Sequence, residues 1–135
     1  MPDRLSFQHT FHALERAMGI TQKRNDLIAS NISNLDTPNY RSKDIDFEAA
    51  MARALASDQN TGMNKTHPKH MDLSSNSAMG EDIFEEKGEW NGINWVNVDE
   101  SMVKLTENSL LYRTAAETLL RKLALVREVI KEGGR

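Results

Sequence analysis

Residues 29–41 read Ala-Ser-Asn-Ile-Ser-Asn-Leu-Asp-Thr-Pro-Asn-Tyr-Arg, and this stretch decides the fold because a long helical pattern stops inside it. Its short polar side chains compete for backbone hydrogen bonds, so they end helices more readily than they continue them. Pro38 cannot extend a helix through its own nitrogen, and it drives Thr37 toward extended geometry. Pro38 and Asn39 suit the central positions of a type II turn, since Asn tolerates the positive φ required at the second. We therefore predict that a long helix ends near Asn34 and that the chain then turns.

The sequence before this turn predicts a helix over residues 4–34 with one apolar seam along its length. The seam alternates spacings of 4 and 3 residues, which is typical of a helix that packs on another helix. Two of its positions, Thr21 and Asn25, are polar, and a polar residue there can set the register or the number of partners. We predict an assembly seam formed by Phe7, Phe11, Leu14, Met18, Ile28, Ile32 and Leu35.

A second long helix is predicted over residues 98–132. Asn97 can cap it together with Glu100 three residues later, and Gly133 follows its end. Further leucines and a valine lie beside the main apolar seam, so one partner helix would not cover all of the apolar surface. The assembly seam predicted on this helix contains Met102, Leu105, Tyr112, Leu119, Leu123, Val126 and Ile130, and Val98, Ser109 and Ala116 complete its spacing.

The segment between the two helices predicts short elements. The apolar spacing from Phe47 to Leu55 predicts a short helix that folds back on a long one, with Asp44 or Asp46 as its cap. Residues 57–82 lose this spacing and are interpreted as a loop.

Residues 83–97 predict a β-hairpin. Asn91-Gly92 is a strong signal for a type I′ turn, with extended residues on either side. A lone hairpin is marginal in water, so Trp90 and Trp95 need a surface to cover. They either cap the chain's own helices or contact a neighbouring subunit, and the sequence leaves both interpretations open.

Composition limits the class of function. Apolar residues make up 39% of the 135 residues, which is a thin supply for an isolated core and suggests burial between chains. The net charge is −3, with the acidic excess in residues 36–97, so the sequence has no basic patch for nucleic acid. There is no cysteine for a disulfide or a thiolate metal site, and no stretch approaches the roughly 20 apolar residues of a membrane span. The N-terminus does not resemble a cleavable secretory signal.

The histidines are the remaining candidates for chemistry. His9 and His12 lie three residues apart on the first helix, and His67 and His70 lie in the predicted loop. No carboxylate or third ligand accompanies them at a metal-binding spacing, so we interpret them as solvated and expect no metal, cofactor or catalytic residue.

Residues 29–41 also resemble the signature of the flagellar basal-body rod and hook family, Ala-x-Asn-Ile-Ala/Ser-Asn-x-x-Thr-Pro-Gly-Tyr. Asn39 stands where most members carry Gly, and both residues tolerate positive φ. The signature turn consists of Asn31, Asn34, Thr37, Pro38, Asn39 and Tyr40, and Ala29, Ile32 and Ser33 also match.

Other segments extend this resemblance over both helices and leave about residues 57–82 unmatched. Residues 91–102 are a partial match to the segment that enters the second helix in rod proteins. Residues 105–112 and 132–134 resemble the B-type proximal-rod subunits more than other rod and hook proteins. Phe7 and Phe11 resemble the element that the export gate reads in such subunits, although two neighbouring seam residues would look the same.

The resemblance implies a structural protein with a mainly α fold. Its two long terminal helices form an antiparallel, coiled-coil-like pair, comprising residues 1–40 and 98–135, and residues 41–97 form a small middle region with a short helix and a β-hairpin. The implied function is a subunit of the flagellar proximal rod that assembles with itself and other rod subunits through its helices. It would lie near the membrane-ring and export-gate end of the periplasmic rod, after passage through the type III export apparatus without a cleaved signal. The alternatives are a cytosolic helical-hairpin adaptor or export chaperone and, far less compatible with the sequence, a histidine-metal hydrolase.

Overall fold

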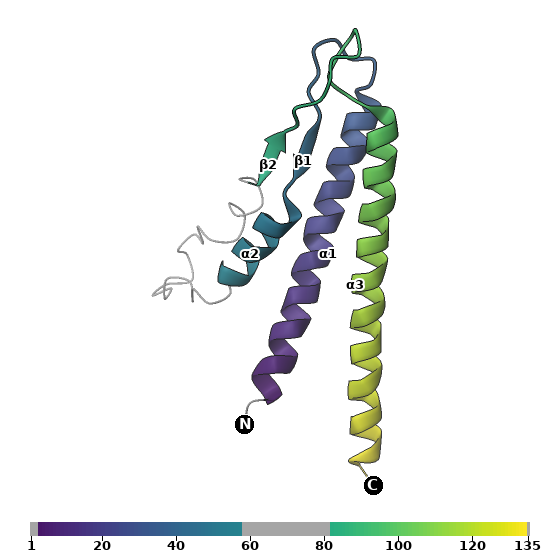
Figure 1. Cartoon of the computed structure of the whole chain (residues 1–135). Coiled ribbons are helices and arrows are strands. Elements are labelled where there is room, and N and C mark those ends of the chain that lie inside the picture. The colour runs from purple at the N-terminus through teal and green to yellow at the C-terminus, as the bar shows by residue number, and fades with distance from the viewer. Residues whose placement is uncertain (1–2, 58–81, 135) are drawn as a thin grey trace, which may run out of the picture.

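The computed structural model describes residues 3–57 and 82–134 and places two long helices side by side. Helix α1 (Asp3–Ser33) and helix α3 (Val98–Glu132) run antiparallel, so the start of α1 and the end of α3 lie at the same pole (Figure 1). Helix α2 (Phe47–Ser57) and two short strands, β1 (Lys43–Ile45) and β2 (Ile83–Glu85), lie beside α1. This arrangement confirms the predicted mainly α fold. The predicted loop falls almost entirely outside the described residues, as do His67 and His70.

One heptad register relates α1 to α3. The Lys122 Nζ lies 5.5 Å from the centre of the Phe7 ring, and Asn108 Nδ2 donates to the Thr21 carbonyl over 2.7 Å. Two heptads after Thr21, just beyond the end of α1, the Leu35 carbonyl accepts a hydrogen bond from Asn94, which lies two heptads before Asn108.

The same register places the intermediate heptad positions opposite one another. Counted from these contacts, the register aligns Leu14 with Ala115 and the buried Ile28 with the buried Ser101. The chain therefore keeps one alignment of α1 and α3 along their shared length.

A small apolar core lies on the other side of α1. Ile20, Ile45 and Ala50 are buried there and come from α1, β1 and α2. The partly buried residues around them are Leu27, Phe47, Met51, Ala54 and Ile83. The predicted short helix thus folds back on α1, and the Asp46 side chain accepts from the Ala49 N–H at 3.1 Å as its cap.

The predicted β-hairpin over residues 83–97 is wrong in its pairing. Strand β2 pairs antiparallel with the distant β1, with Asp44 opposite Phe84. The Asn91-Gly92 signal does mark a turn, but the Asn91 N–H donates to the Asn94 carbonyl at 3.0 Å, so Gly92 is the first central residue and has φ 101°. A type I′ turn requires positive φ at both central residues. A local signal located the turn, whereas contact with β1 decided the strand pairing.

Close backbone packing explains the path after β2. A Cβ at Gly88 would lie 2.6 Å from the Trp95 carbonyl oxygen, so this position has no room for a side chain. Trp95 in turn forms an isolated parallel bridge with Arg41. The segment after β2 therefore packs against residues 40–42.

The predicted turn at the end of α1 is present. Asn39 has φ 60°, and the Tyr40 N–H donates to the Thr37 carbonyl across the turn at 3.3 Å. Asn39 is the only non-glycine residue with positive φ in the described part of the chain. This geometry explains why Asn substitutes for Gly in the signature.

Asn39 therefore provides a test of the turn. We expect Asn39→Gly to change the free energy of unfolding little, because Gly also adopts positive φ. Asn39→Val should lower it by about 1–2 kcal/mol, because a β-branched residue is strained there. Urea unfolding of the two purified variants makes the comparison, and equal stability would contradict the role of φ at this position.

Candidate functional site

The signature residue Asn31 joins the end of α1 to the strand that follows. Asn31 is only 3% exposed, and its amide bonds both backbone groups of Lys43, donating to the carbonyl at 2.8 Å and accepting from the N–H at 3.0 Å. The Tyr40 hydroxyl donates to the same Asn31 Oδ1 at 3.2 Å. An apolar residue at position 31 would leave buried backbone groups without partners.

Asn34 organises the turn itself. Its Nδ2 donates to the Ser30 carbonyl at 2.8 Å, and its Oδ1 accepts from the Thr37 hydroxyl at 3.1 Å. Asn34 thus adds a side-chain donor to a Ser30 carbonyl that already accepts from the Asn34 N–H, whereas Asn31 satisfies the backbone groups of Lys43 in the strand.

A third asparagine, which the sequence did not single out, completes this network. Asn94 is fully buried, and its Nδ2 lies within 2.5–3.2 Å of the carbonyl oxygens of Asn34, Leu35 and Thr37. Its Oδ1 accepts from the Val96 N–H at 3.0 Å. Asn94 thus binds the turn that follows α1 from a segment nearly 60 residues away. The sequence signal for a turn at 91–94 was visible, but it did not indicate which carbonyls the turn would reach.

Asn94 supplies a sharp prediction, because its NH₂ group donates hydrogen bonds and can be replaced by an oxygen that only accepts them. Asn94→Asp keeps the shape but places a carboxylate against three carbonyl oxygens, so the free energy of unfolding should fall by on the order of 3 kcal/mol. The matched control is Asn97→Asp at the exposed N-cap of α3, where Asp caps equally well. Thermal unfolding at neutral pH compares the two, and similar losses for both variants would contradict the assigned role of Asn94.

An ion pair that the sequence analysis missed ties β1 to α1. Arg24 Nε lies 2.7 Å from Asp44 Oδ1, and Arg24 Nη2 lies 2.8 Å from Asp44 Oδ2. Burial by itself raises the pKa of the Asp44 carboxyl, but the Arg24 hydrogen bond and the Ile45 N–H more than offset it, so the pKa is lowered. The hydrogen bond to Asp44 raises the pKa of Arg24. Asp44, one of two predicted helix caps, thus has a different role.

This pair predicts a pH dependence of stability. The pKa of Asp44 is lower in the folded chain than its ordinary value of 3.8, so the unfolded chain takes up the proton first as the pH falls. The stabilisation should be fully present above about pH 4 and be lost as the pH falls through the folded pKa.

Denaturant unfolding across this range should show the parent losing stability with acid more steeply than Asp44→Asn does. A constant difference between the two proteins from pH 6 downward to about pH 3 would contradict the lowered pKa.

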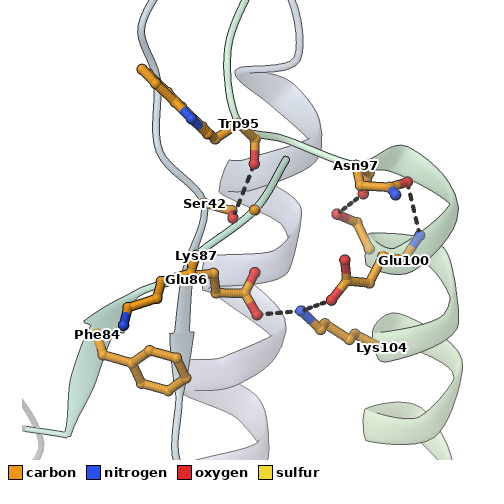
Figure 2. Close-up of a pocket in the computed structure, with 10 residues that line it drawn as sticks. Ser42, Phe84, Glu86, Lys87, Trp95, Asn97, Glu100 and Lys104 are labelled. Carbon is orange, nitrogen blue, oxygen red and sulfur yellow. Dashed lines mark hydrogen bonds and ion pairs between the residues drawn. The ribbon is translucent and has the colours of Figure 1, made fainter. Parts of the chain in front are cut away.

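Lys104 joins the strand region to α3. Figure 2 shows it reaching from α3 toward the carboxylates of Glu86 and Glu100. Its Nζ lies 2.8 Å from the Glu100 Oε1. Burial alone lowers the pKa of Lys104, but the hydrogen bonds to Glu100 and Glu86 outweigh it and raise the pKa. These groups border a cavity of about 190 Å³ with Ser42 and Trp95. The cavity is polar, and within its lining Lys104 is already paired with Glu86 and Glu100.

The seam predicted on α1 is mostly covered, and the seam predicted on α3 is not. Phe7 is 40% exposed, whereas the other apolar members on α1 are buried or half-buried. On α3, Leu105, Leu119 and Val126 are half-buried, but four members of the same seam are exposed: Met102 53%, Tyr112 40%, Leu123 45% and Ile130 69%. The residues that α3 fully buries are Ser101 and Asn108, both polar.

The exposed apolar surface of α3 continues beyond this seam. Leu110, Leu120 and Leu125 are each more than 60% exposed, and so is Val129. A helix that is apolar on more than one side is typical of a helix covered by several neighbours. This surface, defined by the exposed apolar residues from Leu110 to Ile130, is called the α3 surface below.

The two tryptophans lie over the network at the end of α1. Their rings are 4.5 Å apart, and the Arg41 guanidinium lies 4.8 Å from the Trp95 ring centre. Trp95 is half-buried on the chain's own backbone, whereas Trp90 remains 50% exposed. Trp95 therefore packs against Arg41 and close to Gly88, and both interpretations of the tryptophans stay predictions.

Residues 3–57 and 82–134 contain no group of three or more His, Asp or Glu residues that could hold a metal ion. His12 pairs loosely with Glu15, at 3.5 Å. Within the same ranges, no helix is both long and apolar enough to cross a membrane.

Comparison with known proteins identifies relatives over nearly the whole chain. A family model described as "Flagella basal body rod protein" matches residues 11–41, which include the signature turn. The flagellar basal body rod protein FlgB of Cereibacter sphaeroides is 31% identical over 86% of this chain and 89% of its own length. The proteins of the same name from Aeromonas hydrophila and Bacillus subtilis are 30% and 27% identical, each over 94% of this chain and 96% and 97% of their own lengths.

Proposed function

The chain belongs to the family of flagellar basal body rod proteins, and from this premise we propose that it is a proximal-rod subunit whose long helices pack against neighbouring subunits to transmit torque. It is a structural component of the rod and not an enzyme. Its assembly with other rod components follows from the family. What we propose beyond the family is which surfaces the subunit uses for assembly and where in the rod it lies.

The α3 surface is the observation that carries the proposal. Leu120, Leu123 and Ile130 are 64%, 45% and 69% exposed on one helix. Covering a leucine or isoleucine side chain completely stabilises an interface by about 1.5–3 kcal/mol. Residues at this spacing favour helical partners, which other rod subunits or further copies of this chain would supply.

We propose that the export signal lies at the start of the chain, at the opposite end of the sequence from the α3 surface. Phe7 is 40% exposed at the start of α1, and Phe11 is half-buried one turn later. Both positions are available to a receptor once the first turns of α1 separate from α3. We propose that the type III export gate reads this segment and that export occurs without a cleaved signal, bringing the subunit to the periplasmic rod at the membrane-ring end.

The two roles can be separated by mutation. Leu123→Asp should fold as a monomer, because Leu123 is already partly exposed, but a carboxylate buried in the rod would cost several kcal/mol. We expect secretion into the periplasm to continue and incorporation into basal bodies to stop. Leu123→Met, which keeps the apolar surface, is the matched control. Subunit amounts in periplasm and purified basal bodies provide the measurement.

Phe7→Asp should reduce secretion itself and leave the variant in the cytoplasm. Normal basal bodies containing Leu123→Asp would refute the packed α3 surface. Retention of Leu123→Asp in the cytoplasm would refute the division of roles between the two helices.

A further inference from the structure

The Asn91-Gly92 pair, which marks the turn before α3, also has a chemical reactivity that a packing role does not use. It is the only Asn-Gly pair in the 135 residues. The side-chain amide of such an Asn is open to attack by the next backbone nitrogen, because Gly has no side chain to hinder the approach. Both residues are exposed, and among the residues that the structure describes only the chain neighbours come within 4 Å of a Cβ built on Gly92. Water therefore reaches the pair.

The reaction open to this pair is deamidation, and water is its only co-reactant. The Gly92 nitrogen gives up its proton and attacks the Asn91 Cγ. The new N–Cγ bond closes a succinimide ring, the Cγ–Nδ2 bond breaks, and the NH₂ group leaves as ammonia with that proton. One water then opens the ring at either carbonyl, which gives an aspartate or an isoaspartate at this position.

In the folded turn, four hydrogen bonds hold the Asn91 amide. Its Oδ1 accepts from the N–H groups of Ile93 and Asn94, each at 2.9 Å. Its Nδ2 donates to the Asn94 Oδ1 at 2.9 Å and to the Val96 carbonyl at 3.0 Å. These bonds use both hydrogens of the amide and both acceptor sites of its oxygen. The leaving NH₂ group would have to give up two of them, so the folded turn opposes the reaction.

Deamidation would also change the partner of the Asn91 NH₂ group. A carboxylate has no hydrogen to donate, so an oxygen would face the Asn94 Oδ1 and the Val96 carbonyl without a bond. The Asn94 amide presents a donor to this carboxylate only by turning over. That movement takes its NH₂ group away from the carbonyls of residues 34–37, to which it is bound in the folded chain. A change at position 91 would therefore reach the signature turn.

We propose that Asn91 is a deamidation site whose reactivity depends on conformation. It is protected while residues 91–96 are folded and reactive while they are unfolded, and its conversion weakens the contact between Asn94 and the signature turn. The protecting hydrogen bonds all lie within residues 91–96, so they do not require α1 and α3 to be paired. A chain that remains unfolded thus acquires a lasting chemical change at the turn before α3.

Peptide mapping of the purified full-length chain tests the protection. Trypsin releases residues 88–104 as one peptide, because Lys87 precedes it and Lys104 ends it. Mass spectrometry follows deamidation of this peptide after incubation of the chain in mildly alkaline buffer, with and without urea. The folded chain should react at least about tenfold more slowly at Asn91 than the unfolded chain, as expected for a turn that is open less than a tenth of the time.

A free peptide of residues 88–104, incubated in the same two buffers, corrects for the direct effect of urea on the reaction. After this correction, equal rates in the folded and unfolded chain would overturn the proposal.

Two variants within the same peptide locate the source of the protection. Asn94→Ala removes the Oδ1 that holds the Asn91 NH₂ group, so Asn91 should deamidate several-fold faster than in the parent. The matched control is Asn97→Ala, which removes the N-cap of α3 but no bond to Asn91, and its rate should stay near that of the parent. Equal rates in the two variants would contradict protection by these bonds. If Asn94→Ala does not fold, the comparison of the folded and unfolded parent still decides the proposal.

Asn91→Asp reproduces the aspartate product and tests the effect on the signature turn. In NMR spectra of the isotope-labelled protein, the amide signals of residues 34–37 should shift together with those of residues 91–96. Asn97→Asp, the matched control, adds the same charge nearby and should leave the signals of residues 34–37 in place. Shifts confined to residues 91–96 in Asn91→Asp would refute the link to the signature turn.

Discussion

The fold depends on the hydrogen bonds between the Asn94 amide and the carbonyl oxygens at the end of α1. These oxygens belong to the turn that follows α1. Those of Asn34 and Thr37 also accept backbone N–H groups within the turn, and Asn94 adds a donor to all three from a distant segment. The same contact lies in the heptad register that continues through Thr21 with Asn108 to Phe7 with Lys122. One buried amide therefore ties the turn that follows α1 to the turn that precedes α3, and so contributes to the alignment of the two helices.

The ion pairs around this network have a different function from the core. Arg24–Asp44 attaches the strand region to α1, and Lys104–Glu86 attaches it to α3. The apolar cluster around Ile20 lies only on the α2 side of α1. Directional polar contacts thus position the elements, while much of the apolar surface that would normally stabilise a helix pair remains on α3 for other partners.

The sequence predicted those features that depend on neighbouring residues. Both long helices begin and end within a residue of their predicted limits, and the positive φ of Asn39 followed from the Pro-Asn pair. The partner of β2, the reach of Asn94 and the Arg24–Asp44 pair depend on residues far apart in the sequence, so local signals could not identify them. The heptad spacing of α3 was visible, but it did not indicate that Ser101 and Asn108 would be the residues of α3 that become fully buried.

The shared pole of the two helix ends in Figure 1 has a mechanical consequence. A force that pulls the first residues away from the rest of the chain acts first on the layer of α1–α3 contacts nearest the helix ends. The later layers bear no force until that first layer has opened. The helices then unzip one layer at a time, and the force required is that of a single layer, not of the whole contact. The first layer that the structure describes contains the Phe7–Lys122 contact and the Lys122–Thr10 hydrogen bond, whereas the hydrogen-bonded network of Asn31, Asn34 and Asn94 opens last. The chain is thus easily drawn out from its N-terminus and resists the same force longest at its signature turn.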